Sequence, residues 1–214
     1  MKFSIDSEKI LILDFGSQYT QLIARRIREI GVYSEIVSHQ ISYKEIKKNL
    51  PNGIILSGGP ESVYAKKTLT LDPEILNSNI PILGICYGMQ LIAQHFQGKV
   101  KTSKKSEFGN TSITLYRGKI LQKISNKDLN VWMSHGDKVT QLPKGFKKIA
   151  SSKNCSIAAF ANEKHKKYGL QFHPEVTHTE KGSKILEAFI KDVCDCKAKW
   201  RSKNIVEKLI NDIR

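Results

Sequence analysis

Residues 84–88 read Gly-Ile-Cys-Tyr-Gly, the Gly-x-nucleophile-x-Gly pattern of a nucleophile elbow with cysteine in the place of serine. An apolar run precedes them and helical periodicity follows them, so Cys86 is predicted to lie at a tight turn from a strand into a helix. A helix N-terminus favours the thiolate, which is the nucleophilic form of cysteine. Cys86 is therefore a candidate nucleophile, and the alternative for this motif taken alone is a small buried side chain.

A cysteine nucleophile needs a base, and that base needs a group to orient it. Residues 168–175, Tyr-Gly-Leu-Gln-Phe-His-Pro-Glu, place His173 at the end of an apolar strand, where parallel sheets present their ligands. Glu175 can accept the Nδ1 proton of His173 and so hold the other ring nitrogen toward the thiol. The combination predicts a catalytic triad of Cys86, His173 and Glu175.

Acyl transfer also needs donors for the anion that forms on the substrate oxygen. Residues 56–61, Leu-Ser-Gly-Gly-Pro-Glu, follow another apolar strand, so their loop is expected beside the cysteine at the same edge of the sheet. The backbone N–H groups of Gly59 and Tyr87 are the predicted donors of this oxyanion hole. A simple turn is the alternative for this segment, because Gly-Gly-Pro forms turns readily.

The elements that must position these residues alternate over the first 96 positions between apolar runs and helical periodicity. The apolar runs predict strands at residues 9–14, 34–37, 53–57 and 80–85. The helical patterns predict one helix from Ser17, as its N-cap, to a stop at Gly31, and others at residues 43–50 and 89–96. Uninterrupted apolar strands alternating with helices predict an α/β fold with an open, mainly parallel twisted sheet flanked by helices.

Residues 111–172 show a different pattern of short alternating segments separated by turn residues. They predict an added antiparallel β region with strands at 111–116, 131–133, 147–150, 156–161 and 168–172. Helical periodicity returns at residues 183–193 and 203–213. Because the sequence shows no internal repeat and no low-complexity linker, residues 1–195 are expected to form one domain.

The composition is that of a globular chain with an excess of positive charge. Its 214 residues include 35 Lys and Arg against 20 Asp and Glu, a net charge of +15, and 40% of them are hydrophobic, enough for a core. No apolar run approaches the roughly 18 residues that span a bilayer, and the N-terminus lacks the pattern of a secretory signal. With only four scattered cysteines, the chain is expected to be cytoplasmic.

Most of the net positive charge lies between residues 97 and 153, which carry 13 Lys and Arg and three acids. A chain this basic could bind nucleic acid. However, nearly all of these charges are lysines with few aromatic neighbours, whereas base contacts and stacking use arginine and aromatic side chains. A solvated lysine-rich face is therefore favoured, and neither nucleic acid nor a membrane is expected as a partner.

Three motifs together resemble those of the class I glutamine amidotransferases: residues 84–90 (Gly-Ile-Cys-Tyr-Gly-Met-Gln), 173–175 (His-Pro-Glu) and 57–60 (Ser-Gly-Gly-Pro). The resemblance covers the whole chain and is closest to a branch in which the glutaminase domain supplies ammonia to a nucleotide-aminating synthetase domain. The longer stretches that carry it are residues 14–19, 54–62, 131–137 and 171–178. It implies a flavodoxin-like fold and hydrolysis of the glutamine side-chain amide.

The resemblance also implies a role for individual residues. Cys86 would attack the amide carbon of glutamine to form a γ-glutamyl thioester and release ammonia. His173 would transfer the proton, Glu175 would orient His173, and Gly59 and Tyr87 would form the oxyanion hole. The residues expected to bind glutamine are Gly58, Gln90, Ser134, His135, Gly136 and Asp137. No metal or cofactor is expected for this reaction.

A domain organisation follows from the same resemblance. Residues 1–195 would be the glutaminase domain, and residues 196–214 a linker helix leading to an ATP-pyrophosphatase domain missing from this chain, which would bind ATP and Mg²⁺. That domain would dock near the lysine-rich face and form a homodimer. Cys194 and Cys196 form a Cys-x-Cys pair that could suggest a metal site, but no other ligands cluster near them in the sequence, so they are expected to be structural. The alternatives are a stand-alone amidotransferase subunit that docks on a separate synthetase, which the linker-like tail disfavours, and a basic nucleic-acid-binding module.

Overall fold

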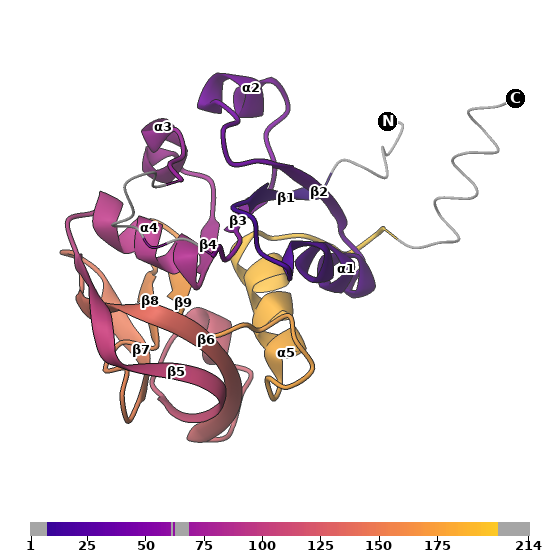
Figure 1. Cartoon of the computed structure of the whole chain (residues 1–214). Helices are drawn as coiled ribbons and strands as arrows, with labels where there is room; N and C mark the ends of the chain where they lie inside the picture. Colours follow the sequence, from indigo (N-terminus) through magenta and orange to yellow (C-terminus); the bar gives the residue numbers. More distant parts are fainter. Residues whose placement is uncertain (1–7, 61, 63–68, 201–214) are drawn as a thin grey trace, which may run out of the picture.

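The described residues of the computed structural model, 8–60, 62 and 69–200, form one nine-stranded sheet flanked by helices (Figure 1). The strand order is β2-β1-β3-β4-β9-β8-β7-β5-β6, with parallel pairing from β2 to β9 and antiparallel pairing from β9 to β6. This confirms the predicted α/β sheet with an added antiparallel region. The helix predicted at residues 203–213 lies outside the described residues.

The parallel half has its most apolar strands at the centre. Its strands are β1 (Lys9–Asp14), β2 (Tyr33–Ser38), β3 (Gly53–Leu56), β4 (Ile82–Ile85) and β9 (Lys167–Leu170). Every residue of β3, β4 and β9 is buried, as expected for strands with helices on both faces. The carboxyl ends of these strands meet at one edge of the sheet, and the loops that follow them carry the predicted chemistry.

Helices cover the two faces of the parallel half in separate groups. One group is α1 (Thr20–Ile30) and α5 (Gly182–Glu187), which continues as a π-helix over Ala188–Val193. The other group is α2 (Tyr43–Lys48), α3 (Pro73–Asn77) and α4 (Tyr87–His95). Alternate residues of β1 point into the two cores, with Ile10 and Ile12 in the first and Leu11 and Leu13 in the second.

The antiparallel half contains two strands much longer than predicted. Its strands are β5 (Lys99–Leu115), β6 (Asp128–Gln141), β7 (Lys147–Ser152) and β8 (Ala159–Asn162), with a short 3-10 turn at Lys119–Leu121. The predicted strands at 111–116 and 131–133 are only the most apolar parts of β5 and β6. The first half of β5 reads Lys-Val-Lys-Thr-Ser-Lys-Lys-Ser, which has almost no apolar alternation, so its strand character comes from pairing with β6.

Two helix starts differ from the prediction. Ser17 is not the N-cap of α1, which begins at Thr20. The Ser17 hydroxyl instead accepts a hydrogen bond from Tyr19 N–H (3.1 Å). Asp14 Oδ1 accepts hydrogen bonds from Gly16 N–H (2.9 Å) and the Thr20 hydroxyl (2.7 Å), so residues 14–20 form a tight loop. The fourth helix starts at Tyr87 rather than residue 89. The sequence does not predict α3, because five residues are too few to show a helical period.

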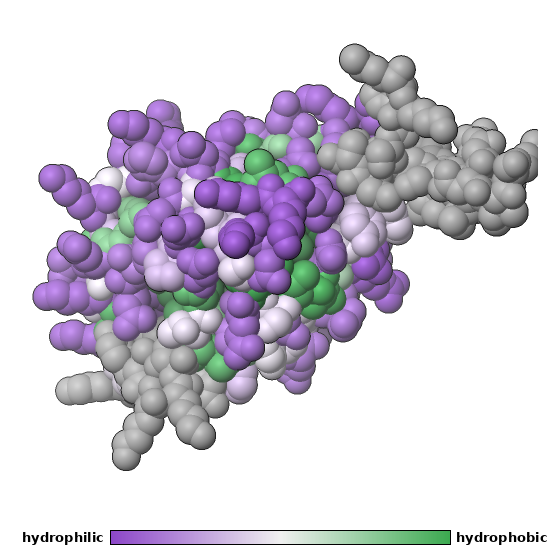
Figure 2. All heavy atoms as spheres, turned by 90° about the horizontal axis from the view of Figure 1, so that it is seen from above, coloured by the Kyte–Doolittle hydropathy of each residue, from purple (hydrophilic) through white to green (hydrophobic). Residues whose placement is uncertain are grey.

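The surface of the molecule is largely polar. Figure 2 shows mainly hydrophilic side chains on the face that is uppermost in Figure 1. Among the described residues, the large hydrophobic side chains that stay exposed are Leu50, Phe108 and Tyr116. None of the helices described here is both long enough and apolar enough to cross a membrane.

Candidate active site

Cys86 lies in the sharp turn between β4 and α4, where the elbow motif predicts it. Its backbone has φ 50° and ψ −103°, a conformation that residues with a side chain rarely adopt. The flanking glycines permit the turn, because a Cβ on Gly84 would lie 2.4 Å from the carbonyl carbon of Gly88. The turn therefore holds the Cys86 sulfur at the N-terminal end of α4.

The close approach of α4 to β3 gives a testable prediction. We expect Gly88→Ala to destabilise the fold by about 3 kcal/mol, because the new Cβ would lie 2.5 Å from the carbonyl oxygen of Leu56 and 2.6 Å from its Cβ. Urea unfolding of the variant and the parent chain measures the difference. Gly136→Ala is the matched control, since no atom lies within 4 Å of its added Cβ. Equal stability of Gly88→Ala and the parent chain would contradict this packing.

His173 follows β9, the strand that pairs with β4, so the two catalytic candidates come from adjacent strand ends. Its backbone is fixed by β6 and by the following loop. The His173 N–H donates to the carbonyl of Trp132 (3.0 Å), and the Thr179 hydroxyl donates to the His173 carbonyl (2.6 Å). These contacts hold the backbone of His173 without involving its ring.

Glu175 lies where the sequence predicts the orienting group. Its Oε1 is 2.8 Å from Nδ1 of His173, and both side chains are almost fully buried. Arg26 in α1 donates from Nε to the backbone carbonyl of Glu175 (3.0 Å), which holds this segment against the helix. The geometry therefore allows Glu175 to accept the Nδ1 proton and leave Nε2 for the cysteine.

His173 and Cys86 border the same cavity. Burial lowers the pKa of His173, but the adjacent Cys86 and the hydrogen-bonded carboxylate of Glu175 outweigh burial and raise it to about 10. The imidazole is therefore protonated at neutral pH, between a sulfur and a carboxylate. A cation beside a cysteine sulfur favours the nucleophilic thiolate.

A cavity of about 330 Å³ opens at Cys86. Its lining includes eight predicted site residues: Gly59, Cys86, Tyr87, Gln90, Ser134, His135, Gly136 and Asp137. His173, Glu175 and Gly58 are not part of the lining. Gly58 packs between the two catalytic candidates, because a Cβ there would lie 3.4 Å from Cε1 of His173 and 3.7 Å from Cβ of Cys86.

The predicted oxyanion donors border this cavity together. A Cβ on Gly59 would lie 2.8 Å from the carbonyl oxygen of Phe15 and 3.5 Å from Cγ of Tyr87, so the loop after β3 packs tightly against the start of α4. Tyr87 is the first residue of α4 and lines the cavity together with Gly59. The two predicted donors therefore lie in residues that border the same cavity as Cys86.

Three further residues line the cavity that are not among the predicted site residues: Pro60, Ser62 and Phe108. Phe108 is 70% exposed at the cavity, and an apolar residue inside the lysine-rich stretch is the signal that could have found it. Gln90 donates from Nε2 to the carbonyl of Asp137 (3.0 Å), and the Ser62 hydroxyl donates to the Asp137 carboxylate. Part of the predicted binding set therefore holds the wall of the cavity.

A second cavity, of about 250 Å³, also reaches Cys86 and, unlike the first, is lined by His173. The loop of residues 16–19 forms one side of it. Within this loop, Tyr19 packs edge-on against the imidazole, with ring centroids 5.0 Å apart. The second cavity shares Gly59, Pro60, Cys86 and Ser134 with the first and adds His173 to the lining.

The other three cysteines are poor candidates for the nucleophile. All four cysteines are free, and Cys155, Cys194 and Cys196 are buried away from both cavities. Burial raises the pKa of Cys155 to about 11 and that of Cys196 to about 12, so both stay as thiols at neutral pH. Cys86 is the cysteine that borders the two cavities.

Comparison with known proteins agrees with this arrangement. The family model described as "Glutamine amidotransferase class-I" matches residues 11–193. The GMP synthase (glutamine-hydrolysing) of Staphylococcus aureus strain JH9 is 50% identical over 214 residues, which are all of this chain but 42% of that protein. The chain therefore spans less than half the length of this curated relative.

Solved structures show the same relationship. A Thermoplasma acidophilum protein assigned as one subunit of a GMP synthase has a TM-score of 0.78 and 33% identity, over 94% of this chain and 98% of that one. A glutamine amidotransferase from Thermotoga maritima has a TM-score of 0.70 at 19% identity, over 89% and 99% of the two chains. The second similarity is one of fold alone.

Proposed function

The chain belongs to the class I glutamine amidotransferases, and we propose on this premise that it hydrolyses the side-chain amide of glutamine with Cys86 as nucleophile. The arrangement of three residues supports the proposal. Cys86 lies in a strained turn at a cavity and shares a second cavity with the buried His173, which Glu175 orients. Gly58, Gly59, Tyr87, Gln90 and residues 134–137 surround the sulfur as the proposed substrate-binding groups.

In the first half-reaction, the Cys86 thiolate attacks Cδ of glutamine. The carbonyl oxygen becomes an anion, which the N–H groups of Gly59 and Tyr87 stabilise. Protonated His173 gives its proton to the amide nitrogen as the C–N bond breaks. The products are a γ-glutamyl thioester on Cys86 and ammonia, and His173 is left neutral.

In the second half-reaction, a water molecule attacks the thioester carbon. Neutral His173 takes a proton from this water, the C–S bond breaks, and Cys86 leaves as the thiolate while glutamate is released. Glu175 keeps the remaining proton on Nδ1, so that Nε2 is the nitrogen that exchanges protons. The second cavity supports this step, because both Cys86 and His173 line it.

We also propose that the ammonia is used to aminate XMP to GMP, an ATP-dependent C–N ligase reaction of purine biosynthesis. The similarity of this whole chain to part of the S. aureus GMP synthase supports this assignment. Because the chain spans 42% of that relative, the amination, together with its ATP and Mg²⁺, is assigned to an ATP-pyrophosphatase domain beyond these residues. The glutaminase step proposed here uses no metal or cofactor.

The partner that carries this domain is proposed to lie in the same chain or in a separate subunit. The S. aureus relative is a longer chain, whereas the T. acidophilum structure is a chain named as one subunit, with an extent similar to that of this chain. Exposed Phe108, within the lysine-rich stretch, is proposed as a docking contact. Homodimerisation is assigned to the synthetase part, and a cytoplasmic location fits four free cysteines.

Because the glutaminase step is assigned to this chain and the amination to the ATP-pyrophosphatase domain, we expect that domain to control the rate of glutamine hydrolysis. We expect the chain alone to release glutamate slowly, because ammonia made without an acceptor is wasted. Adding the ATP-pyrophosphatase domain with XMP and Mg·ATP is expected to raise the rate about 10- to 100-fold. A coupled glutamate assay measures both rates.

The two possible failures of this experiment differ in meaning. Full turnover by the chain alone would contradict control by the partner and leave the glutaminase assignment intact. Absence of glutamate release under every condition would contradict the proposed function. RNA binding with a steep salt dependence at physiological salt would then support the basic nucleic-acid-binding module instead.

A further inference from the structure

A buried polar pair, Glu107 and His135, lies at the wall of the proposed glutamine cavity, which His135 lines. Both side chains are at most 4% exposed, and neither takes part in the two half-reactions above. Glu107 belongs to β5 and His135 to β6, and the two are directly opposite each other in the antiparallel pairing. What the pair does depends on the irregular backbone beside it.

The pairing of β5 with β6 is interrupted where β6 lines the cavity. Thr102 is paired with Asp137 and Glu107 with His135, so residues 103–106 of β5 lie opposite Gly136 alone. Gly136 borders the cavity, and no atom lies within 4 Å of the position that a Cβ would take there. The regular ladder therefore does not fix this part of the cavity wall.

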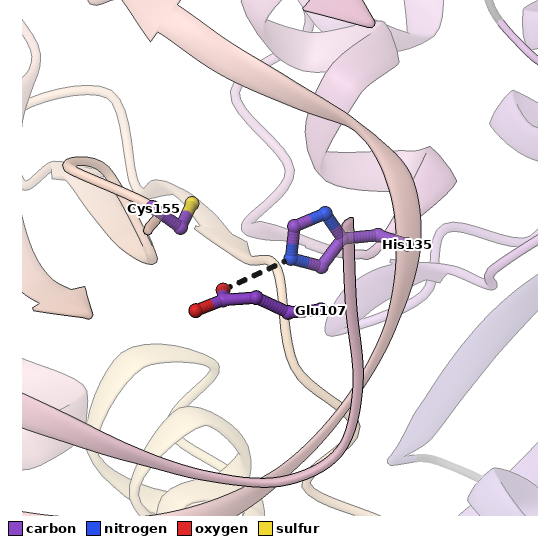
Figure 3. Close-up of side chains that lie close together, drawn as sticks. All are labelled: Glu107, His135 and Cys155. Atoms are coloured by element: carbon purple, nitrogen blue, oxygen red, sulfur yellow. Dashed lines mark hydrogen bonds and ion pairs between the residues drawn. The ribbon is translucent and has the colours of Figure 1, made fainter. Parts of the chain in front are cut away.

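Side chains hold the wall where the ladder does not. His135 Nδ1 is 3.0 Å from the carbonyl oxygen of Asp137, which also accepts from Nε2 of Gln90 (3.0 Å). His135 Nε2 is 3.3 Å from Oε2 of Glu107, the contact drawn in Figure 3. The Ser152 hydroxyl in β7 donates to Oε1 of Glu107 (2.7 Å), which anchors the carboxylate.

These contacts fix the number of protons on the pair. A carbonyl oxygen only accepts, so His135 Nδ1 carries a proton, and the bond between Nε2 and Glu107 needs a second one. With that shared proton the pair has no net charge, as its burial requires. The pKa of His135 lies below its ordinary value, because burial lowers it more than Glu107 raises it, and nearby Lys138 lowers it further.

We propose that Glu107 is a positioning residue for glutamine: through a shared proton it fixes His135, which holds the Asp137 carbonyl and the open backbone at Gly136 in the cavity wall. The proposal rests on the proposed function, since glutamine is the ligand. Loss of the carboxylate would free the His135 ring and loosen this wall, without touching Cys86 or His173.

The same atoms suggest a competing arrangement. Ligand atoms of Glu107, His135 and Cys155 lie within 4.8 Å of one another, close enough for a metal ion to join them. The hydrogen bonds favour the shared proton, because Cys155 Sγ donates to the carbonyl of Ile157 (3.3 Å) and bonds to neither partner in Figure 3. A bound metal is therefore an outcome that the experiment must distinguish.

The test uses three variants, Glu107→Ala, Glu107→Gln and Cys155→Ser, and two alkylating probes of Cys86. A chloromethyl ketone analogue of glutamine binds in the cavity before it reacts, whereas iodoacetamide reports the reactivity of the sulfur alone. We expect Glu107→Ala to raise the half-saturating concentration of the ketone and the KM for glutamine about 10- to 100-fold. The iodoacetamide rate and kcat should change less than about twofold, as the catalytic groups stay in place.

Glu107→Gln should restore near-normal binding, because its amide can donate to Nε2 of His135 and still accept from Ser152. Cys155→Ser should bind normally, since its hydroxyl can keep the bond to Ile157. Normal ketone binding by Glu107→Ala would overturn the proposal. One equivalent of zinc in the purified chain, together with weak binding of the ketone by Cys155→Ser, would also overturn the proposal. If the parent chain shows no saturable labelling by the ketone, the proposed function itself fails.

Discussion

Cys86→Ala is expected to lower glutamate release by about 10⁴-fold or more, because the group proposed to form the thioester is removed. Glutamine binding should persist, since the walls of the cavity come from other residues. Glutamate release measured with excess glutamine, alongside glutamine affinity by calorimetry, separates the loss of chemistry from a loss of binding.

Cys155→Ser is the matched control for the loss of a cysteine. Cys155 is fully buried, and burial raises its pKa to about 11, so it cannot supply a thiolate at neutral pH. We expect this variant to keep the parental rate. Retained turnover in Cys86→Ala, or a comparable loss in Cys155→Ser, would show that another nucleophile acts.

The predicted triad depends on information that is local in the sequence. Each predicted residue follows an apolar strand, and in a parallel sheet the carboxyl ends of neighbouring strands meet at one edge. Cys86 and His173 therefore come together as soon as β4 and β9 are adjacent, although 87 positions separate them in the chain. The sequence could predict this convergence because the strands are short, apolar and easily recognised.

The wall of the cavity could not be predicted in the same way. Glu107 meets His135 only because four residues of β5 lie opposite one residue of β6, and this irregularity has no period in the sequence. The first half of β5 is polar and is stabilised by its partner strand rather than by its own pattern. The residue type of Ser17 predicts an N-cap, but the Asp14 carboxylate organises that loop instead.

His173→Asn is expected to lower kcat/KM for glutamine by about 10²–10⁴-fold, through loss of the group that gives a proton to the leaving nitrogen. The fold should survive, because the backbone contacts to Trp132 and Thr179 do not involve the ring. A normal melting temperature and normal glutamine affinity in the variant would confirm that the loss is chemical. An unchanged rate would exclude His173 as the acid and base.

The pH dependence of kcat/KM in the parent chain and in His173→Asn tests the charge state of the triad. Cys86 and Glu175 raise the pKa of His173 to about 10, so the protonated form that serves the leaving nitrogen persists at neutral pH and is lost as the pH rises through about 10. The parental kcat/KM should therefore fall at that alkaline limit, and the residual rate of His173→Asn should show no such fall. Glu175→Gln removes the carboxylate charge, so its alkaline limit should move to lower pH. An alkaline limit that stays near pH 10 in both variants would belong to another group and would contradict the proton transfer assigned to His173.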